Sequence, residues 1–445
     1  MSMRIATHSM MVPASSVAAF TGYDVVKRES SQKGFLGLVW LAVALGAVAI
    51  FEPSPGDIGI GVLAVAGLLW GKIHWHRALV LPFILLALFV FSNLVSLCYA
   101  FDVNSGALYF VITLFMVVSW LFLTGVLGKH HERGLRAVMS AFSIAGVVSA
   151  LLAILAYFQI IPLGEWLLFF DRIKGFFKDP NVFGPYLVIV AGYALLRLQS
   201  APFSRKIIWA GMCLASTIGV LLSFSRAAWA NYGVTIGLFF VLDLFANRTK
   251  RPAKRIILIA VVMAILAGAV FYATTIPQVG DVVAYRSEIQ SYDSDRFATH
   301  EAALRLGLDN PLGVGPGQSF RQLNYATHNL YLRVFSENGV IGFLALTLFM
   351  LATLVRSLVL SQKAPATFQR SMFCLVAAAL VGTLVNSFAI DTLHWRHLWL
   401  LLAIGWMPLW PKPSVTQTPI ADCPPEQQTE VSTTSTAEAF AAWTT

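Results

Sequence analysis

The chain has 445 residues and a formal net charge of +9, and 57% of its residues are hydrophobic whereas only 12% are charged. An ordinary soluble domain carries about 25% charged residues, so this composition excludes a soluble protein and predicts an integral membrane protein. The positive charge would point to nucleic acid in a soluble protein, but in a membrane protein Lys and Arg accumulate in cytoplasmic loops. We expect a lipid bilayer around the chain and no nucleic-acid partner.

Apolar runs long enough to cross a ~30 Å hydrocarbon core recur along the chain. Because lipid offers backbone polar groups no partner, the predicted fold class is an all-α integral membrane protein, a helical bundle. We predict about twelve transmembrane helices, near residues 35–51, 57–71, 78–100, 107–128, 135–161, 182–198, 206–223, 228–246, 256–276, 338–355, 371–390 and 397–410. The second and the last are short, which leaves the count open by one or two.

The positions of Lys and Arg predict the orientation of the chain. With a cytoplasmic N-terminus, 21 of the 31 Lys and Arg residues lie on the cytoplasmic side, which favours both termini inside. Residues 1–34 then form an N-terminal tail, 35–410 the transmembrane domain and 411–445 a C-terminal tail, and both polar tails are expected to be disordered. A cleaved signal peptide is the alternative for the first span, but its polar leader is too long and its loss would invert every later loop.

No motif indicates a metal or a cofactor. The four cysteines, Cys98, Cys213, Cys374 and Cys423, suggest neither a disulfide framework nor a metal site. The stretch GVGPG has the glycines of a phosphate loop but lacks the Lys-Ser/Thr pair and the preceding strand, so nucleotide binding is not expected. The sequence also lacks HExxH and GxSxG, which argues against metalloproteases and serine hydrolases.

Three segments on the predicted outer side break the topology rule. They are the linker 162–181, which contains RIKGFFKDPNVFGPY, the short turn SFSRAAW at 223–229 and the long loop 277–337. A loop as long as the third is usually functional. Nine of the ten basic residues predicted outside lie in these segments: Arg172, Lys174, Lys178, Arg226, Arg286, Arg296, Arg305, Arg321 and Arg333. Cations kept there against the topology rule suggest an anionic ligand.

The long loop carries its own helical pattern. Ser294 or Asp295 can cap a helix from Arg296 to about Gly307, on which Arg296 and His300 lie one turn apart on the same side. A cation in the first turn opposes the helix dipole by about a few tenths of a kcal/mol unless an anion is present. DNPLGVGPG then predicts an irregular exit, and the amphipathic stretch 330–335 leads into the next span.

Arg226 has two possible roles. An arginine at the end of a span most often reaches to lipid headgroups. Arg226, however, lies between two spans joined by almost no loop, with no acidic residue near it in sequence, so the bundle is expected to surround it. A buried cation needs a partner, and a bound phosphate would supply the charge. The fork-shaped donors of Arg226 and Arg296 suit a diphosphate better than a lysine would.

His328 stands just before a span, in the segment THNLYLRVFSENGVIGF. It is either a loop histidine bonded to a backbone carbonyl or a proton acceptor, because imidazole titrates near neutrality and the same loop presents several arginines. Glu337 in this segment either orients the histidine or caps the following span, and the cap is the expected role.

Four motifs in this order resemble the O-antigen ligase and O-antigen polymerase superfamily: GFFKDPNVFGPYL, SFSRAAW, DNPLGVGPGQSF and THNLYLRVFSENGVIGF. The resemblance covers residues 172–343 and implies a metal-independent, inverting glycosyltransferase without a cofactor. Its donor would be an undecaprenyl-diphosphate-linked oligosaccharide or polysaccharide, used on the periplasmic face of the bacterial inner membrane in lipopolysaccharide or exopolysaccharide biosynthesis. Other polysaccharide assembly proteins would be its protein partners.

The resemblance also implies roles for single residues. Arg226 and Arg296 would hold the diphosphate leaving group, and His328 would take the proton from the acceptor hydroxyl. Arg172, Lys174 and Lys178 are further candidates for the same groove. Arginines would stabilise the charge that builds on the departing diphosphate, and a histidine base would add about 10²–10⁴-fold in rate.

Alternative functions remain open at this point. A polymerase adds the growing chain to another lipid-linked repeat unit, whereas a ligase moves the finished chain to lipid A-core. The stretch KDPNVFGPYL resembles exopolysaccharide polymerases, so a polymerase is expected and a ligase is the alternative. Twelve spans also suggest a transporter or flippase, but transporters place ionisable groups or broken helices at the midplane, whereas the unusual residues here gather at one face.

Overall fold

The computed structural model describes residues 14–247, 252–288 and 291–410, and these are almost wholly helical, in agreement with the all-α membrane class. The α-helices are α1 (Ala14–Leu45), α2 (Pro55–Leu69), α3 (Val80–Leu97), α4 (Val103–Tyr157), α5 (Gly164–Leu167), α6 (Pro180–Ser200), α7 (Phe203–Leu222), α8 (Arg226–Ala246), α9 (Pro252–Thr274), α10 (Pro277–Ser287), α11 (Ser291–Asp309), α12 (Ser319–Leu323), α13 (Leu330–Lys363), α14 (Thr367–Asn386) and α15 (Arg396–Gly405). The other elements are a 3₁₀ turn, η1 (Arg77–Leu79), and two antiparallel strands, β1 (Leu168–Phe169) and β2 (Arg172–Ile173).

Seven helices in the described ranges are long and apolar enough to cross a membrane, and an eighth span is counted if α9 and α10, bent by 97°, form one. Shorter apolar helices lie at Ser30–Leu45, Pro55–Leu69 and Arg396–Gly405. A membrane crossing needs about 20 residues, so the total number of spans depends on whether these shorter helices also cross. The number of twelve spans therefore stays a prediction.

α4 accounts for two of the expected spans in one continuous element. A straight helix of its 55 residues would be roughly 80 Å long, more than twice the hydrocarbon core. The helix is interrupted at His131, where φ is 48° and ψ is −125°. A Cβ on Gly134 would lie 3.4 Å from the carbonyl oxygen of Val126, although eight residues of straight helix span about 12 Å. The chain therefore folds back at His131, which gives two segments of span length.

The N-terminal helix is longer than expected. α1 begins at Ala14, so residues 14–33, which were expected to be disordered, continue the helix of the first span. Propagation adds one hydrogen bond for each residue fixed, so an established apolar helix extends readily into a polar leader that has no proline. Residues 1–13 and the C-terminal tail 411–445 lie outside the described residues.

α14 packs against α6, α8, α13 and α15, and every residue from Met372 to Leu380 is buried. Small residues allow the close approach: a Cβ on Gly382 would lie 2.2 Å from Oγ1 of Thr235 on α8. In lipid, such close packing of helices replaces much of the hydrophobic driving force of a soluble core.

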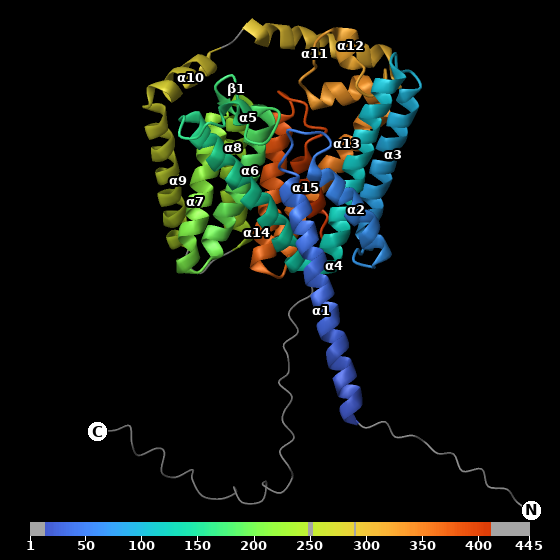
Figure 1. Ribbon diagram of the computed structural model, residues 1–445. Helices are drawn as coiled ribbons and strands as arrows, with labels where there is room; N and C mark the ends of the chain where they lie inside the picture. The colour runs from blue at the N-terminus through green and yellow to red at the C-terminus, as the bar shows by residue number, and fades with distance from the viewer. Residues whose placement is uncertain (1–13, 248–251, 289–290, 411–445) are drawn as a thin grey trace, which may run out of the picture. The chain divides into compact units, whose positions relative to one another are not determined.

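α10, α11 and α12 lie along one end of the bundle, which we term the cavity end (Figure 1). α11 contacts both α12 and α13. α13 begins with the amphipathic stretch predicted at 330–335 and is interrupted at Gly339, where φ is 68°. This end therefore gathers the long loop and the start of α13 at one place.

Candidate active site

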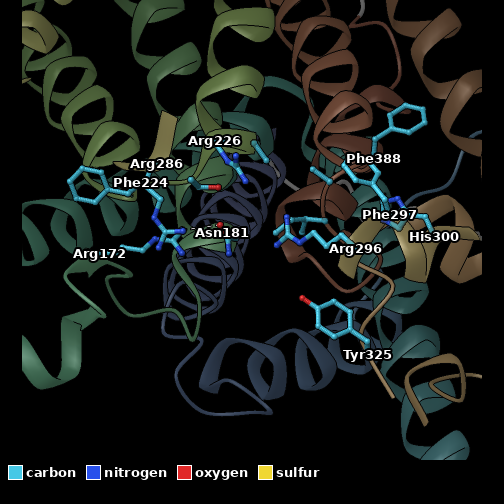
Figure 2. Close-up of a pocket in the computed structure, with 14 residues that line it drawn as sticks. Arg172, Asn181, Phe224, Arg226, Arg286, Arg296, Phe297, His300, Tyr325 and Phe388 are labelled. Carbon is cyan, nitrogen blue, oxygen red and sulfur yellow. Dashed lines mark hydrogen bonds between the residues drawn. The ribbon is translucent and has the colours of Figure 1, made fainter. Parts of the chain in front are cut away.

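A cavity of about 490 Å³ opens at the cavity end. Its walls come from all three segments that carry unexpected basic residues, together with the residues that follow α14. The lining residues are Arg172, Asn181, Phe224, Ser225, Arg226, Ala227, Arg286, Arg296, Phe297, His300, Tyr325, Phe388, Ala389 and Ile390. Among the described residues, the walls hold four arginines and no carboxylate, so they favour an anion. Figure 2 shows Arg226, Arg296 and Arg172 around the same space.

Arg226 is the first residue of α8, directly after a tight turn. Phe224 has a φ of 47°, and Ser225 caps the helix by accepting a hydrogen bond from the Ala228 N–H. Nη1 of Arg226 donates to the carbonyl oxygen of Glu288 at 3.3 Å, which links α8 to the residue after α10. The start of α8 lines the cavity, so the positive end of the helix dipole adds to the charge of Arg226.

Arg296 and His300 both line the cavity, as one turn of helix between them predicts. The expected start of their helix was wrong, because α11 begins at Ser291 and includes Ser294 and Asp295. The stretch SYDSD offers several residues that can cap a helix, and propensity alone does not choose among them. Arg296 therefore lies in the second turn of α11, where the helix dipole matters less. The argument from a cation in the first turn applies instead to Arg226, the first residue of α8.

His300 is the imidazole on the cavity wall. Its ring hydrogen-bonds the backbone of Thr327, and its Nε2 is buried with no hydrogen-bond partner in the described part of the protein. Burial lowers the pKa of His300, the Thr327 bond raises it, and the charge of Arg296 lowers it further, for a net decrease. A buried, unsatisfied nitrogen in a cavity wall indicates a ligand group at this position.

Arg172 is the best placed of the three further candidates for the groove. Its Nε donates to the Ser223 carbonyl oxygen at 2.8 Å and its Nη2 to Oδ1 of Asn181 at 2.9 Å, so it joins β2 to the turn before α8. Lys174 and Lys178 are not among the lining residues. Lys178 instead forms an exposed ion pair with Glu52 at 2.7 Å.

His328 does not line the cavity itself but contacts a residue that does. Tyr325 lines the cavity, and its ring contacts the His328 ring edge to face at 5.9 Å between centroids. His328 has a φ of 46°, an uncommon conformation for a residue with a side chain, and Asn329 next to it caps α13 by accepting from the Leu332 N–H at 3.1 Å. The backbone of His328 is thus held between a turn and a helix start.

The electrostatic surroundings of His328 combine one cation with two carboxylates. Burial lowers its pKa below the ordinary 6.5, and the charge of Arg296 lowers it further, whereas Asp179 and Asp391 raise it in part. The ring is therefore neutral at pH 7 and can accept a proton. The two carboxylates would stabilise the imidazolium that results.

Glu337 does not cap the following span, contrary to expectation. Its carboxylate accepts hydrogen bonds from the Gly317 N–H at 2.7 Å and the Ser319 hydroxyl at 2.6 Å, and it pairs with Arg333 at 3.1 Å. Arg333 also pairs with Asp391 from the segment after α14. This buried network joins the GVGPG turn, α13 and the neighbourhood of His328.

Some residues at the site were not singled out from the sequence. Asn181 and Tyr325 line the cavity, and Asp179 and Asp391 act on His328. Asp179 carried a usable signal, because it stands before a proline at the start of a predicted span, a typical N-cap position. Arg286 was recognised only as one of the outer basic residues.

Comparison with known proteins supports the earlier resemblance. Residues 211–347 match the family model described as O-antigen ligase, and this segment contains Arg226, Arg296 and His328. The match confirms the resemblance to the O-antigen ligase and polymerase superfamily and supports a role in the assembly of surface glycans. No curated protein matches the chain.

Proposed function

We propose, from the O-antigen ligase family match over residues 211–347, that this chain is a glycosyltransferase that moves an undecaprenyl-diphosphate-linked glycan to an acceptor hydroxyl on the periplasmic face of the inner membrane. The observation that carries the proposal is the cavity whose walls hold four arginines and Tyr325, the residue that contacts His328. We take the reaction to be that of a polymerase, with a ligase as the alternative.

The arginines would bind the diphosphate of the donor. Arg226 and Arg296 come from separate helices, and Arg172 is held rigidly by its own hydrogen bonds. Each guanidinium can offer two parallel donors to a phosphate, and a fixed cluster costs no reorganisation when charge develops on the leaving group. This arrangement would stabilise the transition state without a metal ion.

His328 would act as the general base. The acceptor oxygen bonds to the anomeric carbon of the donor sugar while the bond from that carbon to the diphosphate oxygen breaks, which inverts the configuration. The proton of the acceptor hydroxyl passes to the His328 ring, and the electron pair of the broken bond stays on the diphosphate. Asp179 and Asp391 favour uptake of this proton.

His300 is a weaker candidate for the base although it lines the cavity. Among the described residues, the charge that acts on His300 is that of Arg296, which opposes protonation, and no carboxylate contributes. With one ring nitrogen donating to the Thr327 carbonyl, the neutral Nε2 is an acceptor. It would receive a hydrogen bond from a hydroxyl group of the donor sugar.

A deletion strain tests the proposal and separates its two forms. Loss of a polymerase leaves lipid-linked single repeat units, whereas loss of a ligase leaves lipid-linked polymer. We expect single repeats, and complementation with the wild-type chain should remove them. Unchanged lipid-linked glycans and unchanged surface polysaccharide in the deletion strain would refute the function.

A further inference from the structure

A second cavity, which the proposed reaction does not yet use, lies at α12 and the start of α4. Its volume is about 690 Å³, within the range of about 300–1,000 Å³ typical of small-molecule sites. Three aromatic and three polar residues on its walls carry the argument: Phe101, Tyr109, Phe320, Arg321, Gln322 and Asn324. The combination of aromatic faces with amides is what a sugar requires.

The chemistry of a sugar ring explains this match. A pyranose has an apolar face of C–H groups, which gains from contact with an aromatic ring, and hydroxyl groups that both donate and accept hydrogen bonds. Phe320 is 57% exposed and Phe101 85% exposed, so both rings are accessible. The amides of Gln322 and Asn324 are exposed on the same walls and supply donors and acceptors together.

Contacts between α12 and the start of α4 support the second cavity. Arg321 pairs with Asp102 at 2.8 Å, and Gln318 exchanges hydrogen bonds with the backbone of Asp102, which joins α12 to the start of α4. The Tyr109 ring packs on Gly317, where a Cβ would lie 2.3 Å from the ring. The Tyr109 ring and the joint between α12 and α4 are therefore in place before a ligand binds.

Two consecutive residues line this cavity and the arginine cavity. Asn324 lines the second cavity, and the next residue, Tyr325, lines the first and contacts His328. In an inverting transfer the acceptor approaches from the side opposite the leaving group, with the base beside it. The second cavity ends at Asn324, the residue before Tyr325, which contacts His328, so it lies on the His328 side, where an acceptor would have to be held.

The charges of the two cavities also favour the donor in the first and the acceptor in the second. The first has four arginines, whereas the only ionised residue on the second is Arg321, which Asp102 neutralises. A diphosphate would gain little electrostatic attraction in the second cavity. An uncharged group rich in hydroxyls does not depend on such attraction.

A third cavity at this end is a competing location. It is lined by Tyr157, Glu165, Asp171 and Gln278 among others, and it borders the first cavity where the Tyr157 ring lies 6.1 Å from that of Phe224. That is the wall of Arg172 and Arg226, the side of the leaving group. An acceptor bound there would adjoin the wall of Arg172 and Arg226. The proposed base, His328, instead contacts Tyr325, which lines another part of the first cavity.

We infer that the cavity of Phe101, Tyr109, Phe320, Gln322 and Asn324 binds the terminal sugar of the acceptor glycan and delivers its hydroxyl to His328. The inference rests on the proposed function. It assigns donor and acceptor to separate cavities on the two sides of residues 324–325.

Transfer kinetics of the purified full-length protein in lipid nanodiscs test the inference. The donor is the lipid-linked repeat unit isolated from the deletion strain. The varied acceptor is an oligosaccharide from partial acid hydrolysis of the surface polysaccharide, which carries no diphosphate and cannot serve as donor. Phe320→Ala should raise the KM for acceptor about tenfold, the scale of one lost stacking contact, and Phe320→Trp should restore it. Asn324→Gly, which tolerates the φ of 53° at this position, should also raise it. The KM for donor should not change.

Gln278→Ala and Glu165→Gln in the third cavity are the matched controls and should leave both KM values unchanged. The inference is overturned if these controls raise the KM for acceptor, or if Phe320→Ala leaves it unchanged or raises the KM for donor instead.

A binding measurement separates failure of the inference from failure of the proposed function. Oligosaccharides from partial acid hydrolysis of the host's own surface polysaccharide carry no diphosphate and exist whatever this chain does. Saturation-transfer NMR titrations should give the same dissociation constant for wild type and Arg226→Ala and one about tenfold larger for Phe320→Ala. No binding to wild type overturns the inference, whereas binding without any transfer activity overturns only the glycosyltransferase function.

Discussion

Gly313 and Gly339 pack against each other so closely that neither position admits a side chain. A Cβ on Gly313 would lie 2.7 Å from the Gly339 nitrogen, and one on Gly339 would lie 2.8 Å from the Gly313 nitrogen. Both residues also have positive φ, 86° and 68°. The interruption of α13 and the GVGPG turn thus pack directly on each other. This close contact, rather than nucleotide binding, explains the glycines at positions 313 and 339.

Gly339→Ala should destabilise the protein by more than about 2 kcal/mol, because a left-handed conformation and a backbone collision are both penalised. Thermal unfolding in detergent, followed by size-exclusion chromatography, measures the loss. Gly237→Ala on α8 is the control, since a Cβ there meets nothing within 4 Å, and it should be neutral or slightly stabilising. Equal melting temperatures for the two variants would show that this close contact tolerates a side chain.

Glu337→Ala should cost about 1–3 kcal/mol for each buried donor that it leaves without an acceptor, chiefly the Gly317 N–H and the Ser319 hydroxyl, whereas Arg333 keeps its pair with Asp391. Glu301→Ala removes an exposed partner of Arg305 and should cost no more than about 1 kcal/mol. The same melting measurement compares the pair. A small effect of Glu337→Ala would mean that the network contributes little to the folded state.

His328→Ala should lower kcat by about 10²–10⁴-fold while the protein still inserts and binds donor, because the arginines hold the diphosphate. His300→Ala should have a smaller effect and act mainly on the KM for donor. Glycan transfer at equal protein concentration, together with donor binding, checks both variants. If His300→Ala abolished turnover and His328→Ala did not, the two imidazoles would exchange roles.

The pH dependence of kcat should report the charges around His328. A general base must be neutral, so activity falls as pH drops through its pKa, and the lowered pKa places this acid limb below the ordinary 6.5. Arg296→Gln removes a charge that lowers the pKa, so the acid limb should move to higher pH. Asp179→Asn keeps the cap on α6 but removes a charge that raises the pKa, so the limb should move to lower pH. Shifts of the same sign in both variants would exclude His328 as the titrating group.

Arg226→Lys should lower kcat by about 10–100-fold although the charge is kept, because the lysine loses the paired donors and the bond to the Glu288 carbonyl. Arg305→Lys on the long loop 277–337 is exposed and serves as the control. Transfer assays on both variants decide the matter. Full activity of Arg226→Lys would argue that Arg226 only reaches toward lipid headgroups.

The sequence is informative about this protein wherever the signal is local. Apolar runs predict helices because lipid offers backbone polar groups no partner. Arg226 and Arg296 stand out because each is a basic residue on the predicted outer side, where the topology rule expects few. The one-turn spacing of Arg296 and His300 predicts their shared wall, since a helix repeats every 3.6 residues.

The remainder depends on contacts between residues far apart in the chain. Two partners of Glu337, Gly317 and Ser319, lie 18–20 residues earlier, and Arg333 meets an aspartate 58 residues later, which periodicity does not indicate. The start of α11 was misplaced because several residues there can cap a helix. The second cavity likewise arises only when α12 is joined to α4 through Asp102.

The cluster of Arg172, Arg226, Arg286 and Arg296 has a consequence for turnover on the proposed function. When the glycosidic bond breaks, the lipid diphosphate gains a negative charge, so the cluster holds the spent carrier more tightly than the loaded one. Release of the carrier then becomes the slow step, and the carrier inhibits the next cycle by competing with fresh donor. Flux through the protein would depend on whatever activity removes or dephosphorylates the spent lipid, so the rate of chain growth is set partly outside the cavity.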